Sequence, residues 1–408
     1  MDAGQSYVIF GRDSFPNPLE LTDLDGNNGF AINGVNAGDQ SGHGVSDAGD
    51  VNGDGLDDIL IGADFSSALG RTQAGQTFLF YGSREPMPAT VELSAINGAN
   101  GLIIQGARAS DFSGFGLSGA GDVNGDGYAD MLIGADLADP GGRIEAGQAF
   151  VVYGGPSLAA SIDLLSLGCP DGFAINGVIA GDKAGFAVAN AGDVNGDGLG
   201  DVLIGAHSAD PSARIDAGQS YVIFGDRSCP GSIELSTLNG SAGFVIDGAN
   251  NGDQSGFALA GAGDVDGDGV DDLLIGAPFA AADGPDAGRT YLLFGSRAAF
   301  PAALDLATLD PNAGLTILAV AADSQTGQAV AAAGDTNGDG LGDILVGAPT
   351  TPLAGNPGIG TAHLLFGANL RGVPEVGPRG GTGVADRVIG TAGDDNGVGS
   401  LDGGGGDD

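Results

Sequence analysis

The stretch Asp50-Val-Asn-Gly-Asp-Gly-Leu-Asp-Asp58, followed directly by Ile59-Leu-Ile-Gly-Ala63, decides the fold of this chain. The pattern Gly-Asp-x-Asn/Asp-Gly-Asp-Gly occurs five times, each time before a short apolar segment. Successive copies start 72, 71, 71 and 71 residues apart. A period of this length indicates one supersecondary unit per repeat. The first Asp of each copy is Asp50, Asp122, Asp193, Asp264 and Asp335.

Each repeat holds four apolar runs of strand length, bounded by Gly, Asn, Asp and Pro and without comparable helical periodicity. In the third unit these runs, strands A to D, are residues 186–191, 201–206, 218–225 and 244–248. Four-stranded units repeated around an axis form a β-propeller, which leaves only short sheet edges. The sequence therefore predicts an all-β propeller with five repeats of about 71 residues and a partial N-terminal unit.

The termini fall inside repeats. Counting gives strands C and D at the N-terminus, four full units, and a last unit with strands A, B and C. The N-terminal strand D, residues 30–34, is a candidate to complete the last unit, because closing a ring removes an open edge. One strand C is then left over, so we expect the chain to be part of a longer one, and the propeller to span residues 1–367.

Residues 368–408 are rich in Gly and polar residues, which predicts a linker and tail. Two segments, Gly390-Thr-Ala-Gly-Asp-Asp395 and Gly403-Gly-Gly-Gly-Asp-Asp408, look like degraded starts of the nonapeptide calcium repeat of RTX proteins. Their Gly-Asp-Asp triplets are 13 residues apart, which departs from a period of nine. A plain Gly/Asp linker is the alternative interpretation.

The composition excludes several partners. The 53 Asp and Glu against 13 Lys and Arg give a formal net charge of −40, which disfavours nucleic acid and anionic membranes. The 80 glycines fit many tight turns between short strands. The sequence contains no apolar run long enough for a transmembrane helix, and its first residues do not resemble a cleavable secretion signal.

The two cysteines, Cys169 and Cys229, are too few for a disulfide framework. Both fall between strands C and D of successive units, so a disulfide between units is conceivable. Without a distance between them, free thiols are the favoured prediction.

The five acidic loops carry the metal chemistry. Each places carboxylate or amide oxygens at positions 1, 3, 5 and 9, and calcium takes 6 to 8 such oxygens at roughly 2.3–2.6 Å. The backbone carbonyl of position 7 completes the expected set. We therefore predict about five Ca²⁺ ions. The ligands are Asp50, Asn52, Asp54, Leu56 and Asp58; Asp122, Asn124, Asp126, Tyr128 and Asp130; Asp193, Asn195, Asp197, Leu199 and Asp201; Asp264, Asp266, Asp268, Val270 and Asp272; and Asp335, Asn337, Asp339, Leu341 and Asp343.

Other acidic loops fit less well. An EF-hand needs Glu at position 12, where these loops carry Ile or Val inside a predicted strand. Dockerin loops are followed by a helix rather than a strand. A single Asp-Gly loop is often an ordinary turn, but five copies with every ligand position filled favour a β-flanked calcium loop.

The units resemble FG-GAP repeats, the blades of the integrin alpha-chain propeller. Phe115-Gly116, Asp122-Val-Asn-Gly-Asp-Gly127 and Ile275-Gly-Ala-Pro278 carry the motifs of that name, and the resemblance covers about residues 3–367. It implies extracellular or cell-surface binding or adhesion, with a protein or glycan ligand on the B–C and D–A loops and structural calcium on the opposite A–B loops. The family's ring has seven blades, so five units suggest missing sequence or an atypical closure.

Within the B–C loops, Arg71, Arg143 and Arg214 recur at equivalent positions. Either they form a cationic rim for an acidic ligand, or they pair with neighbouring acids such as Asp136, Asp139 or Asp210; the second alternative is favoured.

Nothing in the sequence points to catalysis. The three histidines, His43, His207 and His363, occupy different repeat positions, and no Ser lies in a Gly-x-Ser-x-Gly context. The sequence thus predicts a non-enzymatic binding or adhesion module. The alternative is an accessory propeller of a larger secreted hydrolase.

Overall fold

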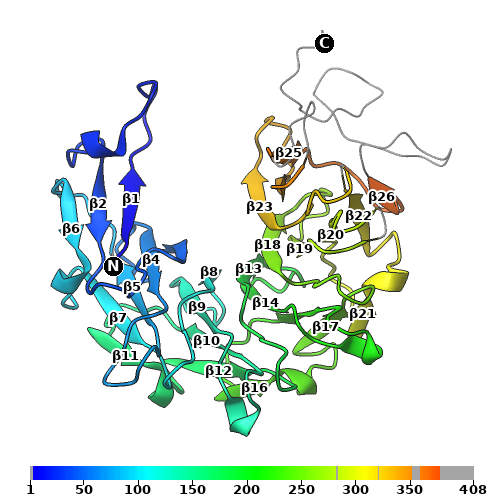
Figure 1. Ribbon diagram of the computed structural model, residues 1–408, viewed down its shortest axis with the longest axis horizontal. Helices are drawn as coiled ribbons and strands as arrows, with labels where there is room; N and C mark the ends of the chain where they lie inside the picture. Colours follow the sequence, from blue (N-terminus) through cyan, green and yellow to red (C-terminus); the bar gives the residue numbers. More distant parts are fainter. Residues whose placement is uncertain (1–2, 282–283, 320, 352–358, 377–408) are drawn as a thin grey trace.

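The computed structural model describes residues 3–281, 284–319, 321–351 and 359–376, and the chain is all-β as predicted (Figure 1). Its sheets follow one another around a common axis in chain order and form an open arc (Figure 1). The helical segments in the described residues are short 3-10 turns, and none is long and apolar enough to cross a membrane.

Four blades are complete, each an antiparallel sheet of strands A, B, C and D. Strand A lies on the concave side of the arc (Figure 1). Blade 1 is β3 (Val45–Gly49), β4 (Asp58–Ala63), β5 (Gln76–Phe80) and β7 (Gly101–Gln105); blade 2 is β8 (Leu117–Gly121), β9 (Asp130–Ala135), β10 (Gln148–Val152) and β12 (Gly172–Asn176); blade 3 is β13 (Val188–Gly192), β14 (Asp201–Ala206), β15 (Gln219–Ile223) and β17 (Gly243–Asp247); blade 4 is β18 (Ala258–Gly263), β19 (Asp272–Ala277), β20 (Arg289–Leu293) and β22 (Gly314–Leu318).

A partial blade stands at each end of the arc. The N-terminal one has strands C and D only, and the last one has strands A, B and C. These strands are β1 (Gln5–Ile9) and β2 (Gly29–Asn33) at the N-terminus, and β23 (Ala329–Gly334), β24 (Asp343–Ala348) and β25 (Thr361–Leu365) at the other end.

A short fifth strand, which the sequence did not reveal, joins each blade to the next. The C–D connection of one blade adds it in parallel to strand D of the preceding blade; for example, Ser232–Glu234 of blade 3 pairs with Ala174, Ile175 and Asn176 of blade 2. A 3-10 turn follows each of the first four. The fifth strands are β6 (Thr90–Glu92), β11 (Ser161–Asp163), β16 (Ser232–Glu234), β21 (Ala303–Asp305) and β26 (Glu375–Val376), and the turns after the first four are η2 (Leu93–Ala95), η4 (Leu164–Ser166), η6 (Leu235–Thr237) and η7 (Leu306–Thr308). The remaining 3-10 turns are η1 (Leu21–Asp23), η3 (Pro140–Gly142) and η5 (Pro211–Ala213).

The core lies between neighbouring blades. Strand B is central in each complete blade, and every residue of β9, β14 and β19 is buried. Between blades 2 and 3, Val151 and Phe173 pack in one apolar cluster with Val202 and Tyr221. Because each sheet is covered on both faces by its neighbours, the strand runs are continuously apolar rather than alternating.

The predicted ring closure is wrong. Strand β2, which contains the proposed closing strand at residues 30–34, pairs with β1 and β6 and not with the last blade. In the described residues the last sheet has three strands, ordered β23-β24-β25. The pairing of β2 with β1, strand C of the same partial blade, is local in sequence, so it forms without bringing the ends of the chain together.

Residues beyond Gly367 still contact the propeller. Leu370 and Val376 are buried in the core cluster of blade 4, and Thr316 and Ile317 of β22 pair with β26. The predicted tail and its RTX-like segments, residues 377–408, lie outside the described residues.

Cys169 and Cys229 form a disulfide, which corrects the prediction of free thiols. The fifth strand β16 begins just after Cys229 and lies on β12 of blade 2, which begins just after Cys169. Their Cα atoms are consequently 5.8 Å apart, within the range of disulfides. The bond therefore links the connections of blades 2 and 3.

Replacing Cys169 and Cys229 together by serine should lower the free energy of unfolding by about 4 kcal/mol, because the bond closes a loop of 60 residues in the unfolded chain. Urea unfolding followed by circular dichroism measures this change. As a control, the wild-type protein in reductant should unfold at the midpoint of the double variant. Equal midpoints for wild type with and without reductant would show that the disulfide does not contribute.

Candidate calcium loops

Each A–B connection forms the same nine-residue loop, at the end of the blade opposite the B–C connections. In the first loop, Gly53 and Gly55 have φ angles of 76° and 83°, a conformation that other residues rarely adopt. The turn lets the backbone N–H groups of Asp54 and Gly55 donate to the two carboxylate oxygens of Asp50, at 3.0 and 2.9 Å. The equivalent two bonds form in all five loops.

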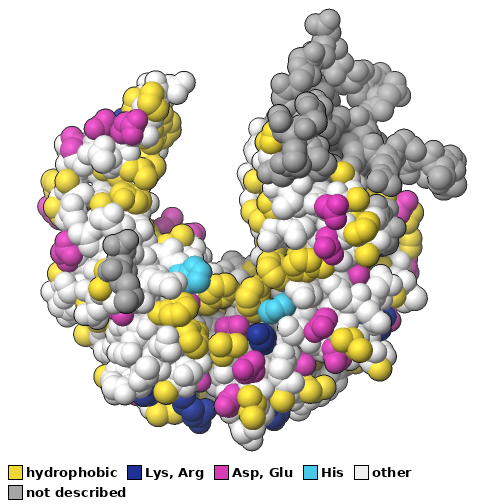
Figure 2. All heavy atoms as spheres, viewed as in Figure 1, with side chains coloured by type: hydrophobic (Ala, Val, Ile, Leu, Met, Phe, Trp, Pro, Cys, Tyr) yellow, Lys and Arg dark blue, Asp and Glu magenta, His cyan; other side chains and the backbone are white. Residues whose placement is uncertain are grey.

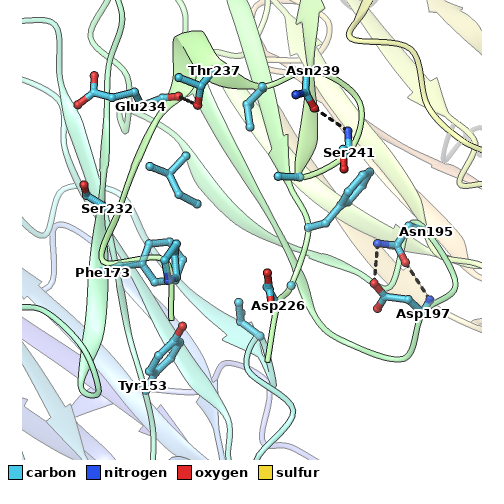
Figure 3. Close-up of a pocket in the computed structure, with 17 residues that line it drawn as sticks. Tyr153, Phe173, Asn195, Asp197, Asp226, Ser232, Glu234, Thr237, Asn239 and Ser241 are labelled. Carbon is cyan, nitrogen blue, oxygen red and sulfur yellow. Dashed lines mark hydrogen bonds between the residues drawn. The ribbon is translucent and has the colours of Figure 1, made fainter. Parts of the chain in front are cut away.

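Positions 3 and 5 hold each other in place. Asn52 accepts the N–H of Asp54 at Oδ1, and its side-chain amide donates to Oδ2 of Asp54 at 3.1 Å. Figure 3 shows the same two bonds between Asn195 and Asp197 in the third loop. The second and fifth loops repeat the bond between amide and carboxylate with Asn124–Asp126 and Asn337–Asp339.

The fourth loop differs because Asp266 replaces the asparagine. It therefore has no amide to donate, and ligand oxygens of Asp264, Asp266 and Asp268 lie within 4.8 Å of one another. Arg371 supplies the missing donor: its Nη2 donates to Oδ2 of Asp268 at 2.5 Å, and its Nε lies 2.5 Å from Oδ2 of Asp266.

Position 9 is a buried aspartate that ties the loop to strand C. In blade 1, one oxygen of Asp58 accepts the N–H of Val51 at 3.1 Å and the other accepts the N–H of Gly82 at 2.9 Å. Gly82 follows the end of β5, and a Cβ there would lie 2.6 Å from the carbonyl oxygen of Asp57. This contact explains the aromatic-Gly pair that ends strand C. The other four pairs are Asp130–Gly154, Asp201–Gly225, Asp272–Gly295 and Asp343–Gly367.

Burial raises the pKa of the position-9 carboxyl groups in the first four loops. The pKa of Asp58 rises to about 6, and those of Asp130, Asp201 and Asp272 rise to about 7. Desolvation is the main cause, and the carboxylates at positions 1 and 5 raise the values further. A cation in the loop would relieve both effects.

The donor set fits calcium, since all side-chain donors are hard oxygens and no His or Cys belongs to a loop. The structure brings positions 1, 3 and 5 together on one turn. The carboxylates at positions 1 and 5, Asp50 and Asp54, are near enough to raise the pKa of Asp58 at position 9. The N–H of the position-7 residue donates to the position-5 carboxylate, as Leu56 does to Asp54 at 3.0 Å. The ligand roles of all five positions, including the position-7 carbonyl, stay a prediction.

Sequence reasoning missed the arginines around the loops. Arg84 contacts the backbone carbonyl of Gly55, and Arg227 that of Gly125. Arg297 contacts the carbonyls of Asp268 and Gly269 at 3.1 and 2.7 Å. An Arg shortly after strand C in three units was the available signal.

A pocket of about 520 Å³ lies between the third loop and the C–D connection of blade 3 (Figure 3). Asn195 and Asp197 stand at one side, and Tyr153 and Phe173 of blade 2 form part of the wall. The hydroxyl group of Tyr153 is buried and makes no hydrogen bond. The third loop therefore lines a surface that blades 2 and 3 share.

On the opposite end of the blades, the three recurring arginines are paired. Each contacts the last residue of the fifth strand that the next blade adds to its own blade: Arg71–Asp163 at 2.9 Å, Arg143–Glu234 at 2.7 Å and Arg214–Asp305 at 2.9 Å. The structural alternative is thus confirmed, but with partners other than the nearby acids that the sequence suggested. The arginines thus attach three of the fifth strands, β11, β16 and β21, to the preceding blades.

A row of aromatic side chains follows the starts of the A strands. Ring centroids of His43 and Phe115 are 4.9 Å apart, those of Phe115 and Phe186 5.1 Å, and those of Phe186 and Phe257 5.2 Å. His207 lies 4.3 Å from Phe186, and burial lowers its pKa to about 4. Figure 2 shows hydrophobic and histidine side chains along this concave edge, with acidic and basic groups nearby.

The histidines form no catalytic group in the described residues. His43 pairs with the buried carboxylate of Asp64 at 3.1 Å, as a rim residue. His363 bonds the hydroxyl group of Thr361 at 2.9 Å. These contacts are consistent with structural roles.

Comparison with known proteins agrees with this geometry. The FG-GAP repeat family matches residues 45–80, 114–152, 184–223, 255–293 and 326–365, each from strand A to strand C of one unit. Among similar proteins, phosphatidylinositol-glycan-specific phospholipase D of Bos taurus is 33% identical over 171 residues, which is 41% of this chain and 19% of that protein.

Integrin alpha chains are similar as well. Integrin alpha-PS2 of Drosophila melanogaster is 32% identical over 186 residues, 44% of this chain and 12% of the relative. Integrin alpha-IIb of Homo sapiens is 30% identical over 176 residues, 42% of this chain and 15% of the relative. The matched region thus spans less than a fifth of each relative.

Chelation should lower the melting temperature, because each site at a hundredfold calcium excess over its Kd contributes about 2.7 kcal/mol. Calorimetry should count about five ions in the wild type. Asp54→Asn should weaken one of these sites. Asp57→Asn, which changes an exposed neighbour outside the predicted ligand set, is the control and should bind as the wild type does. A melting curve that chelator leaves unchanged would contradict a structural role for calcium.

Serine at positions 71, 143 and 214 together should destabilise the protein by on the order of 1 kcal/mol per arginine, because each loses a partly buried ion pair. Thermal unfolding measures the loss. Arg12→Ser, at an exposed site near the N-terminus, serves as the control. An unchanged melting temperature in the triple variant would show that the pairs do not stabilise the blades.

Proposed function

Because the chain is an FG-GAP repeat protein, we propose that it is a calcium-binding extracellular β-propeller that acts as a binding or adhesion module for a protein or glycan ligand. In this proposal calcium has a structural role. Its loops are fixed at one end of the blades, and the ligand binds at the other end, on the B–C and D–A loops.

The aromatic row on the concave edge carries the ligand half of the proposal. Phe115, Phe186 and Phe257 are half-buried and come from three successive blades, so one continuous aromatic surface crosses the blades. Aromatic rings give large contact areas at low entropic cost, and they are enriched where proteins bind partners. The paired arginines, in contrast, no longer support a cationic ligand rim.

Two observations support an extracellular or cell-surface location. The Cys169–Cys229 disulfide is typical of proteins from oxidising compartments. The similar integrins and phospholipase D are extracellular or surface proteins.

A second candidate function is an accessory propeller in a larger secreted hydrolase. The similarity to phosphatidylinositol-glycan-specific phospholipase D favours it. Fold similarity alone does not transfer an activity, and the described residues contain no catalytic group that would support one. Finding the native polypeptide joined to a hydrolase domain would favour this candidate over the adhesion module.

Phe186→Ser should weaken binding of the purified protein to its ligand by at least tenfold, because it interrupts the aromatic row at its centre. Surface plasmon resonance against a panel of matrix proteins and glycans measures the loss. Phe15→Ser changes an exposed ring in the C–D connection of the N-terminal partial blade, at the end of the blades opposite the row, so it is the matched control. Calcium stoichiometry and melting temperature should be compared in both variants. Equal binding by the two variants would exclude the row as the ligand site.

A further inference from the structure

The fourth calcium loop contains one carboxylate more than the others. Asp266 occupies position 3, where the other loops carry asparagine, and its side chain is 1% exposed. A buried carboxylate needs a charged or hydrogen-bonding partner. Oδ2 of Asp266 lies 2.5 Å from Nε of Arg371, which supplies that partner.

Arg371 meets that need from outside the repeat. Its guanidinium donates to the oxygen of Asp268, Oδ2, that accepts the asparagine amide in the other loops. At the predicted ligand positions the other loops carry three carboxylates and this loop carries four, and Arg371 places a positive charge beside the additional one.

The same guanidinium also anchors the segment that ends in β26. Arg371 contacts the carbonyls of Asn312 and Gly295 at 3.3 and 3.2 Å and stacks 5.1 Å from the ring of Phe294. β26 itself pairs with β22 through two residues only. Backbone hydrogen bonds from Thr316 to Pro374 and from Gly372 to Pro311, and the buried side chains of Leu370 and Val376, hold the same segment, so the arginine is one of several attachments.

We propose that Arg371 is the charge partner of the fourth calcium loop, and that calcium and Arg371 compete for Asp266 and Asp268, so that calcium loosens β26. The inference rests on the calcium role proposed above. Both cations are attracted by the same two carboxylates, and each lowers the negative charge available to the other. The coupling is reciprocal: the factor by which Arg371 lowers the affinity of the loop for calcium equals the factor by which bound calcium weakens the binding of Arg371 to the loop.

Hydrogen-exchange mass spectrometry during a calcium titration tests this coupling, because separate peptides report the fourth loop and the residues around β26. In the wild type, calcium should protect the loop and increase exchange near β26. Arg371→Gln should raise calcium affinity at this loop about fivefold or more at low salt. It should also make exchange near β26 fast both with and without calcium.

Asp266→Asn should have the opposite effect on affinity, because the loop then carries the ordinary three carboxylates with Arg371 still beside them. The double variant Asp266→Asn/Arg371→Gln recreates an ordinary loop, in which the new amide can donate to Asp268. Its calcium affinity should return to within about twofold of the wild type. Opposite single effects that cancel in the double variant distinguish charge competition from a general loss of structure.

Arg297→Gln is the matched control, because it removes one positive charge that contacts only backbone carbonyls of the same loop. It should leave exchange near β26 unchanged and should not restore the affinity of Asp266→Asn. If Arg371→Gln lowers calcium affinity, or if calcium slows exchange near β26, the proposal of competition is wrong while the calcium sites stand. If no loop responds to calcium, the proposed calcium role itself fails.

Discussion

The buried aspartate at position 9 is the interaction on which each blade depends. Asp58 and its equivalents, at the start of strand B, join the A–B loop to the glycine after strand C. Two backbone N–H groups compensate only part of the cost of burying a carboxylate, as the raised pKa values show. The fold therefore leaves an electrostatic deficit at the same place in each of the first four repeats. A cation bound there would contribute to stability, which is how the proposed calcium sites would act on the architecture.

Contacts between blades determine how far the stabilisation of one blade extends to its neighbours. A repeat protein is stabilised by each unit and by its contacts with the two neighbours. Here the contacts are of three kinds: apolar packing between sheets, a fifth strand placed on the preceding blade, and an arginine that pins that strand. The disulfide adds a fourth between blades 2 and 3. Because these contacts connect only adjacent blades, we expect a change in one A–B loop to affect most strongly the interface between its own blade and the neighbouring blade.

Much of the fold could be predicted because the repeat offers five aligned copies of each element. Strand B of the third unit was expected at residues 201–206, and β14 has these bounds. The fifth strand could not be predicted, since Ser232–Glu234 is too short to show a periodic pattern and its partner lies in another blade. The errors on Cys169–Cys229 and on the arginine partners both follow from this omission. The spacing of the predicted ligands could be recognised in the sequence. The hydrogen-bond partner of Asp58 after strand C, Gly82, could be identified only in the folded structure.

The fourth loop shows how a distant residue changes the meaning of a local substitution. Asp and Asn have nearly the same shape, so Asp266 preserves the turn while it removes a donor and adds a charge. Arg371 lies 103 residues beyond Asp268 and follows the end of the last strand C, and it replaces both the donor and the charge balance. In this loop the fold brings a guanidinium to the added carboxylate. The extra carboxylate, Asp266, therefore lies in blade 4, against which the segment after β25 packs. The charge of Asp266 is compensated as long as that segment keeps Arg371 in place.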